Sequence, residues 1–327
     1  MQLKEIYRPI IKEMTAIERT IRLSIETGGN KSILSISDHL LSSGGKKLRS
    51  ALVILSAKAT AADVPRAISR QVIKVASAVE LVHMASLIHD DVVDHSEIRH
   101  NKPTINSKWG QNVSIILGDY IYSVGFDLIS SCRNPDVIDC ISKATRTTCE
   151  GELIQVCERD NLNLLKERYI TIVKNKTANI FAASCRAGVL AVDRQAVVKD
   201  RLMKYGLNFG IAFQIVDDSM DLIGEARALG KAPGADFRMG EVTLPILNLL
   251  SQAKDKEKVL ALLRKGGQKS FNELRERFIN SESFAKTKKE ACSYIQKAKN
   301  NISVLKDSCY KQSLFSLADF IIRDFNN

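Results

Sequence analysis

The stretch VIKVASAVELVHMASLIHDDVVD, residues 72–94, decides how this chain folds. It contains neither Gly nor Pro, and apolar residues occupy nearly every face of a helix drawn through it. A helix of that kind is stable only when other helices surround it, so the stretch predicts the interior helix of a bundle. The same helix runs directly into the aspartates Asp90, Asp91 and Asp94. We therefore expect the core of the fold to open onto an acidic site.

Helical periodicity extends outward from this stretch over almost the whole chain. The interior helix is predicted to begin after Asp63, a capping residue, and Pro65, and to run to about Glu97. Irregular stretches are predicted at 99–110 and 230–240, where Gly and Pro interrupt the pattern. The other predicted helices span about 2–27, 33–43, 111–131, 136–160, 164–191 and 194–224, with a helix start near Lys46 and about four helices after Val242. Because no repeat or linker is visible, the sequence favours one compact all-α domain over residues 1–327.

The net charge of +11, from 48 Lys and Arg against 37 Asp and Glu, raises the question of nucleic-acid binding. Aromatic residues make up only 6% of the chain, and no nucleic-acid-binding motif is visible, so this class of partner is not expected. Residues 252–311 hold fifteen basic and seven acidic side chains, which places most of the excess on the C-terminal helices, away from the acidic site. A solvated helical face is the simpler interpretation, and peripheral contact with anionic lipid is the alternative.

The cysteines and the N-terminus indicate the compartment. Seven cysteines without CxxC spacing are interpreted as buried apolar residues of a reducing compartment, which argues against disulfides and a zinc site. The first residues, MQLKEIYRPIIKEM, do not resemble a secretory signal. No run approaches 18 uninterrupted apolar residues, so no membrane span is predicted. We therefore expect a cytoplasmic protein.

Two acidic clusters of the form DDxxD dominate the polar residues, DDVVD at 90–94 and DDSMD at 217–221. In a helix, the first and last aspartate of each cluster share one face, about 6 Å apart along the axis. The carboxylates of such a cluster repel one another and are disfavoured by the helix dipole at a helix C-terminus, unless cations bind there. Carboxylates near diphosphates suit Mg²⁺. One cluster alone fits a solvated helix end, but two that follow apolar runs favour a metal site. The candidate ligands are Asp90, Asp91, Asp94, Asp217, Asp218 and Asp221.

Candidate cations for a diphosphate lie near Gly-rich turns and after the acidic clusters. Gly44-Gly45 precedes Lys46 and Arg49 at a predicted helix start, where free backbone amides also favour anions. The other candidates are Arg99, Lys176 and Lys231. Each one alone is a common surface cation.

Together these motifs resemble the trans-isoprenyl diphosphate synthases of the polyprenyl synthetase family, and in detail the octaprenyl-type long-chain members. The resemblance covers about residues 40–250. The motifs that carry it are GGKKLR (44–49), ELVHMASLIHDDVVDHSEIRHNKPT (80–104), LGDY (117–120), EGELIQ (150–155), KT (176–177), FGIAFQIVDDSMD (209–221) and GKAPGADFRMGEVTLP (230–245).

The resemblance implies a helical bundle around a central cavity, in which the six aspartates hold about three Mg²⁺ ions together with an allylic diphosphate. It implies that Arg99, Lys176 and Lys231 contact the allylic diphosphate. It further implies that Lys46, Arg49 and His83 bind isopentenyl diphosphate. The allylic carbon–oxygen bond would ionise, the double bond of isopentenyl diphosphate would attack, and proton loss would complete the condensation. Thr177 and Gln214 match positions whose oxygens face the cation, although a hydrogen bond within the helix is the alternative for Thr177. The family is usually homodimeric.

Two residues depart from the pattern of the family. His100 stands where a second arginine usually follows Arg99, which puts the affinity for isopentenyl diphosphate in doubt or makes it sensitive to pH. Glu241 stands where the family often has lysine. These departures keep a partner-dependent subunit as an alternative to an active enzyme.

Ala85 and Ser86 precede Asp90 by five and four residues, where short-chain members of the family carry bulky aromatic side chains. Their small size predicts a long-chain product of the kind that supplies quinone side chains. If the two residues serve only helix packing, a medium-chain product such as geranylgeranyl or farnesyl diphosphate is the alternative.

Overall fold

Helices make up nearly all of the computed structural model, which describes residues 2–26, 31–42, 44–61, 66–192, 197–224 and 233–325. The N-terminal half contains α1 (Leu3–Ile6), η1 (Arg8–Ile10), α2 (Ile11–Glu26), α3 (Lys31–Ser42), α4 (Leu48–Thr60), α5 (Arg66–Val93), β1 (Ile98–Arg99), β2 (Lys102–Pro103), α6 (Ile105–Trp109), α7 (Gln111–Ser131) and α8 (Pro135–Cys157). The C-terminal half contains α9 (Lys166–Val173), η2 (Lys174–Ala178), α10 (Asn179–Leu190), α11 (Lys199–Ile223), α13 (Ala235–Arg238), α14 (Leu244–Gln252), α15 (Lys256–Lys265), α16 (Gly267–Ile279), α17 (Glu282–Ile302), α18 (Cys309–Ile321) and η3 (Ile322–Phe325). The all-α prediction is confirmed.

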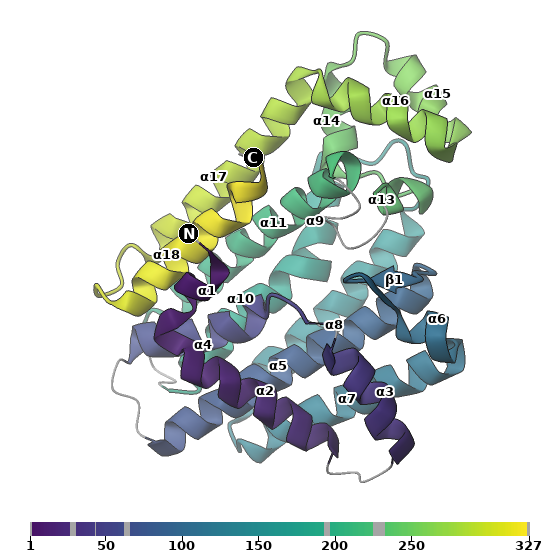
Figure 1. The fold of residues 1–327 in the computed structure, drawn as a ribbon. Helices are drawn as coiled ribbons and strands as arrows, with labels where there is room; N and C mark the ends of the chain where they lie inside the picture. The colour runs from purple at the N-terminus through teal and green to yellow at the C-terminus, as the bar shows by residue number, and fades with distance from the viewer. Residues whose placement is uncertain are drawn as a thin grey trace.

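Helix α5 is the interior helix of the bundle, as its sequence predicts. It packs against α2, α4, α7 and α10 (Figure 1). Its residues 75–79 are almost completely buried, although the stretch includes a serine. At Gly125 of α7, an added Cβ atom would lie 3.3 Å from the carbonyl oxygen of Ala78, so a glycine lets these two helices approach closely. The core therefore forms around the stretch that ends in the first acidic cluster.

Two helices of the described chain, Ser69–Val93 and Gln111–Ser131, are long and apolar enough to cross a membrane by length and composition alone. The sequence prediction missed them because it required an uninterrupted apolar run. In the first helix, 61% of the most apolar window is buried within the bundle, which accounts for its composition. In the second, only 33% of the window is buried. Helix α7 thus leaves more of its apolar surface uncovered.

The prediction that residues 99–110 form an irregular stretch is wrong. Strands β1 and β2 form an antiparallel hairpin, and α6 follows. His100 and Asn101 make its two-residue turn with φ angles of 51° and 61°, a conformation typical of a tight hairpin that asparagine tolerates well. Thr104 then caps α6, because its side chain accepts a hydrogen bond from the Ser107 amide at 3.0 Å. These elements are too short to show periodicity.

Several boundaries also differ from the prediction. Helix α5 ends at Val93 rather than near Glu97, and Pro9 lies in η1, which interrupts the predicted N-terminal helix. After Val242 the described residues form five α-helices rather than about four. The predicted start signals Asp63 and Pro65 lie outside the described residues.

The cysteines are free, as their spacing suggests, but their predicted burial is mostly wrong. Only Cys185 is buried, and three of the seven are exposed, Cys149, Cys157 and Cys309.

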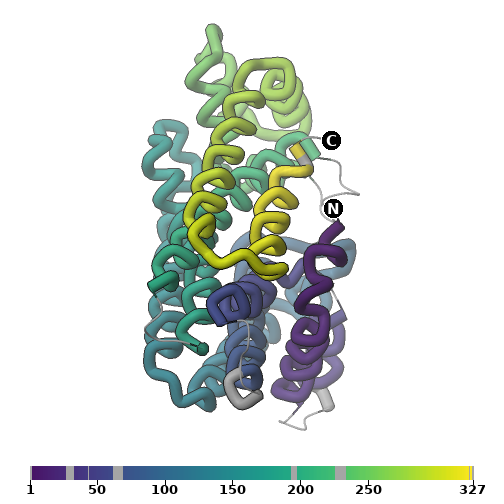
Figure 2. The backbone as a smooth tube through the Cα atoms, turned by 90° about the vertical axis from the view of Figure 1, so that its left-hand side faces the viewer, coloured from purple at the N-terminus to yellow at the C-terminus, as the bar shows by residue number. Residues whose placement is uncertain are grey.

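The two ends of the described chain lie side by side (Figures 1 and 2). The Ser313 hydroxyl of α18 donates a hydrogen bond to the Ile6 carbonyl oxygen of α1 at 2.9 Å. Helices α17 and α18 run along one side of α11, the helix that carries the second acidic cluster. The C-terminal helices therefore support one wall of the cavity described next.

Candidate active site

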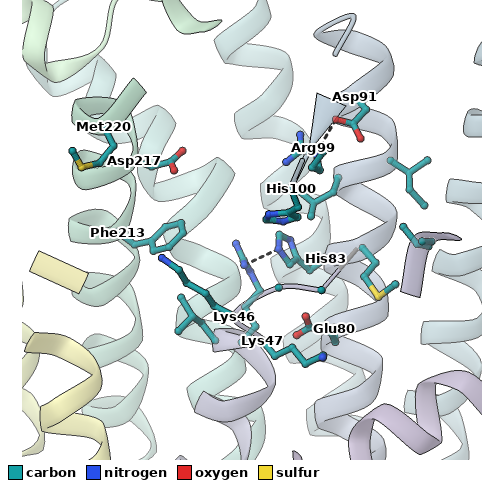
Figure 3. Close-up of a pocket in the computed structure, with 18 of the residues that line it drawn as sticks. Lys46, Lys47, Glu80, His83, Asp91, Arg99, His100, Phe213, Asp217 and Met220 are labelled. Carbon is teal, nitrogen blue, oxygen red and sulfur yellow. Dashed lines mark hydrogen bonds and ion pairs between the residues drawn. The ribbon is translucent and has the colours of Figure 1, made fainter. Parts of the chain in front are cut away.

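A cavity of about 1590 Å³ separates the two acidic clusters. Asp91 lines it from α5 and Asp217 lines it from α11, while Lys46 and Lys47 project from the segment before α4 (Figure 3). The predicted cations Arg49 and Arg99 also line this cavity. Residues more than a hundred positions apart in the sequence therefore surround one space.

The second cluster has one open carboxylate and two that are enclosed. Asp217 is exposed, whereas Asp218 and Asp221 are 5% and 2% exposed. Asp218 accepts hydrogen bonds from the Tyr169 hydroxyl at 2.5 Å and from Gln214 Nε2 at 2.7 Å. Asp221 accepts one from the Asp236 amide at 3.1 Å. Asp217 is thus the carboxylate of this cluster that a ligand in the cavity meets first.

The first cluster is held by two arginines. Asp91 pairs with Arg99 at 2.8 Å, and Asp94 pairs with Arg159 at 2.6 Å. Asp90 has no arginine partner among the described residues and is half-buried. Burial raises the pKa of Asp90 to about 7, against the opposing effect of the nearby Lys176 ammonium. A free carboxylate under this desolvation is stabilised by any cation that approaches it.

The donor set fits Mg²⁺, a cofactor that the sequence motifs imply. All candidate ligands are carboxylate oxygens, and the described residues contain no preassembled group of three or more metal-ligating side chains. Mg²⁺ commonly takes only one or two carboxylates in such sites and completes its shell with water and substrate phosphate. The exposed Asp217 on one wall of the cavity, and the first cluster on the other wall, match that requirement.

Lys176 reaches the first cluster from a stretch of π-helix, η2, that joins α9 to α10. Its ammonium pairs with Glu152 of α8 at 2.8 Å. Burial alone would lower the pKa of Lys176, but Glu152 and Asp90 together raise it, so this side chain stays charged. A π-helical turn is rare and often marks a functional position.

Thr177 and Gln214 belong to one chain of hydrogen bonds that ends on the second cluster. The Thr177 hydroxyl donates to Gln214 Oε1 at 2.7 Å, so its hydrogen bond leaves its own helix. Gln214 Nε2 in turn donates a hydrogen bond to Asp218. Tyr169 supplies the other hydrogen bond to Asp218, and burial raises the pKa of this tyrosine, which keeps it a donor.

The third group of candidates forms the floor of the cavity. Arg49 donates to His83 Nε2 at 2.8 Å, and its guanidinium lies 4.2 Å from the centre of the Phe181 ring. Burial lowers the pKa of Arg49 to about 10, and burial together with Arg49 lowers the pKa of His83 well below its usual value. His83 is therefore a neutral acceptor beside a charged Arg49. Lys46 and His100 are exposed at the same end of the cavity (Figure 3).

Ala85 and Ser86, the residues predicted to govern the length of the product, differ in their surroundings. Ala85 is fully buried among core residues, and Ser86 is half-buried, with its hydroxyl donating to the His83 carbonyl at 2.8 Å. Tyr122 of the facing α7 helix lies within electrostatic reach of Asp90, since burial, Cys149 and Asp90 all raise the pKa of its phenol.

Sequence reasoning missed three side chains at the site, and one predicted residue lies outside the described residues. The missed residues are Glu152, Arg159 and Tyr169, which reach the site only through tertiary contacts. Lys231 is the predicted cation that falls in the part of the chain without a description.

The C-terminal cations are also nearer the site than expected. Arg275 and Lys288 line the cavity, although the charge excess of this region was predicted to lie away from the chemistry.

Comparison with known proteins identifies the family. The polyprenyl synthetase family model matches residues 30–278. A short chain isoprenyl diphosphate synthase of Methanothermobacter thermautotrophicus is 32% identical, with 98% of each chain covered. Component 2 of the heptaprenyl diphosphate synthase of Geobacillus stearothermophilus is 33% identical over 80% of each chain.

Solved structures show the same fold. A polyprenyl synthase from Caulobacter crescentus, solved with calcium and isoprenyl diphosphate, has a TM-score of 0.92 at 31% identity, covering 98% of this chain and 97% of the other. A decaprenyl diphosphate synthase from Rhodobacter capsulatus has a TM-score of 0.90 at 28% identity, covering all of both chains. The chain therefore belongs to the polyprenyl synthetase family and is a trans-prenyltransferase.

Proposed function

We propose that this chain condenses isopentenyl diphosphate with an allylic diphosphate, in a reaction that requires Mg²⁺, and that it makes a long-chain all-trans polyprenyl diphosphate. The observation that carries the proposal is the pair of acidic clusters on facing helices, α5 and α11, across a cavity whose other walls hold Lys46, Arg49 and Arg99. Carboxylates on two sides and cations between them suit a diphosphate bound through metal ions.

Asp90, Asp94 and Asp217 are the carboxylates that we propose as direct metal ligands, since they are the least enclosed of the six. The metal ions would act as Lewis acids on the diphosphate leaving group. The remaining aspartates, Asp91, Asp218 and Asp221, are buried and accept hydrogen bonds from protein groups, so we assign them to holding the site in shape.

Arg99 and Lys176 would bind the allylic diphosphate, together with Lys231 on the strength of the family resemblance. Arg49, His83 and Lys46 would bind isopentenyl diphosphate at the other end of the cavity. Arg49 is held by its hydrogen bond to neutral His83 and by the Phe181 ring, so its guanidinium is preorganised for a phosphate. The oxygen atoms of the hydrogen-bonded Thr177–Gln214 pair would stabilise a developing allylic cation, and apolar walls would limit its access to water.

A long-chain product is favoured by the absence of a large side chain at Ala85 and Ser86. The names of the relatives range from short chain to decaprenyl, so they support elongation without fixing its length.

We further propose that the chain acts as a single domain and as a homodimer. Helices α7 and α8 expose apolar side chains that a second copy would cover, Ile115, Ile116, Leu153 and Val156. A subunit that needs a different partner chain remains the competing proposal, since one relative is named as a component of a larger synthase.

Asp90→Asn tests the metal site. We expect kcat/KM to fall roughly 10³-fold, because a neutral amide cannot hold the metal that stabilises the leaving diphosphate. Turnover of radiolabelled isopentenyl diphosphate measures the change. The matched control is Asp119→Asn, an exposed carboxylate of α7 whose neighbour is His89, and it should leave turnover unchanged. Equal activity of both variants would contradict the proposed metal site.

A further inference from the structure

Arg159 joins two carboxylates that come from distant parts of the chain. Its Nη2 lies 2.6 Å from Asp94 Oδ1 and 3.3 Å from Glu241 Oε1. The three side chains are only 18%, 26% and 12% exposed, in that order. Ion pairs this enclosed are screened far less than surface pairs, so the position of the guanidinium is well defined.

The backbone fixes this arrangement. The Asp160 amide donates to the Gly240 carbonyl oxygen at 2.8 Å, which joins the turn after α8 to the turn before α14. Gly240 has a φ of 72°, a left-handed conformation that favours glycine, and an added Cβ atom would lie 2.2 Å from Asp160 Oδ1. Arg159 and Glu241 are the chain neighbours of the two residues that share this hydrogen bond, Asp160 and Gly240.

The segment that contains Gly240 is also hydrogen-bonded to the second acidic cluster. The Gly234 amide donates to the Asp221 carbonyl oxygen at 2.8 Å, and the segment from there leads through α13 to Glu241. Glu241 accepts a second hydrogen bond from Gln155 of α8. Glu241, which belongs to the segment bonded to the second cluster, thus holds Arg159 beside the first cluster.

Arg159 keeps an unused donor. Its Nε is buried and has no hydrogen-bond partner among the described residues. Its two carboxylate partners also differ in their access to other cations, because Asp94 belongs to the acidic cluster and Glu241 does not. When Asp94 turns to another cation, Glu241 still holds the guanidinium in place.

We propose that Arg159 is a further ligand of the allylic diphosphate and that Glu241 is the residue that positions it. The inference rests on the proposed function. The resembling family often carries lysine where Glu241 stands, so the charge at this position is inverted here, and a lone glutamate would repel a diphosphate. Arg159 places a positive charge directly beside Glu241, in a group that can bind phosphate through two parallel hydrogen bonds.

Binding of inorganic pyrophosphate in the presence of Mg²⁺, measured by calorimetry, tests the role of Arg159 without turnover. Arg159→Met should weaken this binding about tenfold or more, since a charge-assisted hydrogen bond is lost. The KM for the allylic substrate should rise in parallel, while the KM for isopentenyl diphosphate stays within about twofold. Combining Arg159→Met with Glu241→Lys should restore most of the pyrophosphate affinity, because a cation returns next to the position that Arg159 occupied. Arg168→Met, which removes an ion pair with Glu158 just after α8, is the matched control and should change none of these values.

The outcomes separate this role from its alternatives. A purely structural role predicts a lower melting temperature, both KM values changed together and no rescue by the double variant, and that pattern would overturn the proposal. Unchanged pyrophosphate affinity in Arg159→Met, with normal binding by the unmodified chain, would overturn it too and leave the proposed function intact. If the unmodified chain binds no pyrophosphate with Mg²⁺, the proposed function fails together with the role of Arg159.

Discussion

The Arg49–His83 pair shows how single residues set the charge of the cavity. Because His83 is kept neutral, it orients Arg49 without adding a second positive charge. His100, which lines the same cavity, is different: its side chain is exposed and shares no hydrogen bond with Arg49. Partial burial, Arg99 and Lys46 lower its pKa, so in the free protein it is neutral at pH 7. A bound diphosphate would favour its protonated form.

The affinity for isopentenyl diphosphate should therefore depend on the protonation of His100. Its lowered pKa places the change below about pH 6.5, with the stronger binding on the acidic side. We expect the KM of His100→Gln to equal that of the unmodified chain at pH 8 and to exceed it about threefold to tenfold at pH 6. The ratio of the two KM values cancels the titration of the substrate itself.

His100→Arg is the companion variant, and its advantage over His100→Gln should persist at both pH values. A KM ratio that stays flat between pH 6 and pH 8 would show that His100 does not contact this substrate.

The sequence predicts individual residues well where a local motif carries them. Asp91, Asp217 and Arg49 line one cavity, and the Thr177–Gln214 pair is connected by hydrogen bonds to Asp218, although the roles of these residues stay predictions. Arg159 could not be found in this way. It joins Asp94 and Glu241 across 65 and 82 positions of the chain, and no local pattern distinguishes it from a surface arginine.

At the scale of the elements, the π-helical turn η2 depends on one glycine of α8. A Cβ atom added to Gly151 would lie 2.3 Å from the Lys176 amide nitrogen and 2.8 Å from the Asn175 carbonyl carbon. Both are backbone atoms, so no side chain can move aside. The glycine in EGELIQ therefore sets how closely α8 approaches the turn that presents Lys176.

Gly151→Ala should destabilise the protein by about 1–3 kcal/mol, the usual cost of forcing extra volume into a packed contact. Denaturant unfolding measures the loss. Lys143→Ala, an exposed position on the same helix, should stay within about 0.5 kcal/mol. Should Gly151→Ala unfold at the same denaturant concentration as the unmodified chain, the close approach of α8 and η2 would be wrong.

Long elements were predictable and short ones were not. Helix α7 begins and ends at the predicted residues, because its ends coincide with Gly110 and with the break before Pro135. The hairpin β1–β2 and the helix α6 are two to five residues long, which is below the length at which a period becomes visible. The π-helical turn leaves no trace in the pattern, since a helix continues on either side of it.

For the whole molecule, the uncovered apolar surface of α7 and α8 is the main feature that the bundle leaves without a partner. Ile116 and Leu153 are 68% and 67% exposed. Large exposed apolar side chains on adjacent helices are typical of surfaces that bind another chain. The proposed homodimer would cover them.

Ile116→Glu should shift the protein from twice the chain mass of 36.3 kDa toward the single mass, because a buried unpaired charge opposes association. Light scattering over a concentration series measures the mass. Val304→Glu changes an exposed valine outside α7 and α8, 58% exposed, and should leave the mass unchanged. A single chain mass for the unmodified protein would refute the homodimer.

Incubation of the purified chain with farnesyl diphosphate, isopentenyl diphosphate and Mg²⁺, with the products sized by chromatography, tests the central claim most directly. The arrangement of the two acidic clusters predicts products, and their loss when the metal is chelated. The small residues Ala85 and Ser86 predict that these products extend well beyond geranylgeranyl diphosphate. A stop at geranylgeranyl diphosphate would contradict the long-chain product, and the absence of any product would contradict an enzyme that is active without a partner chain.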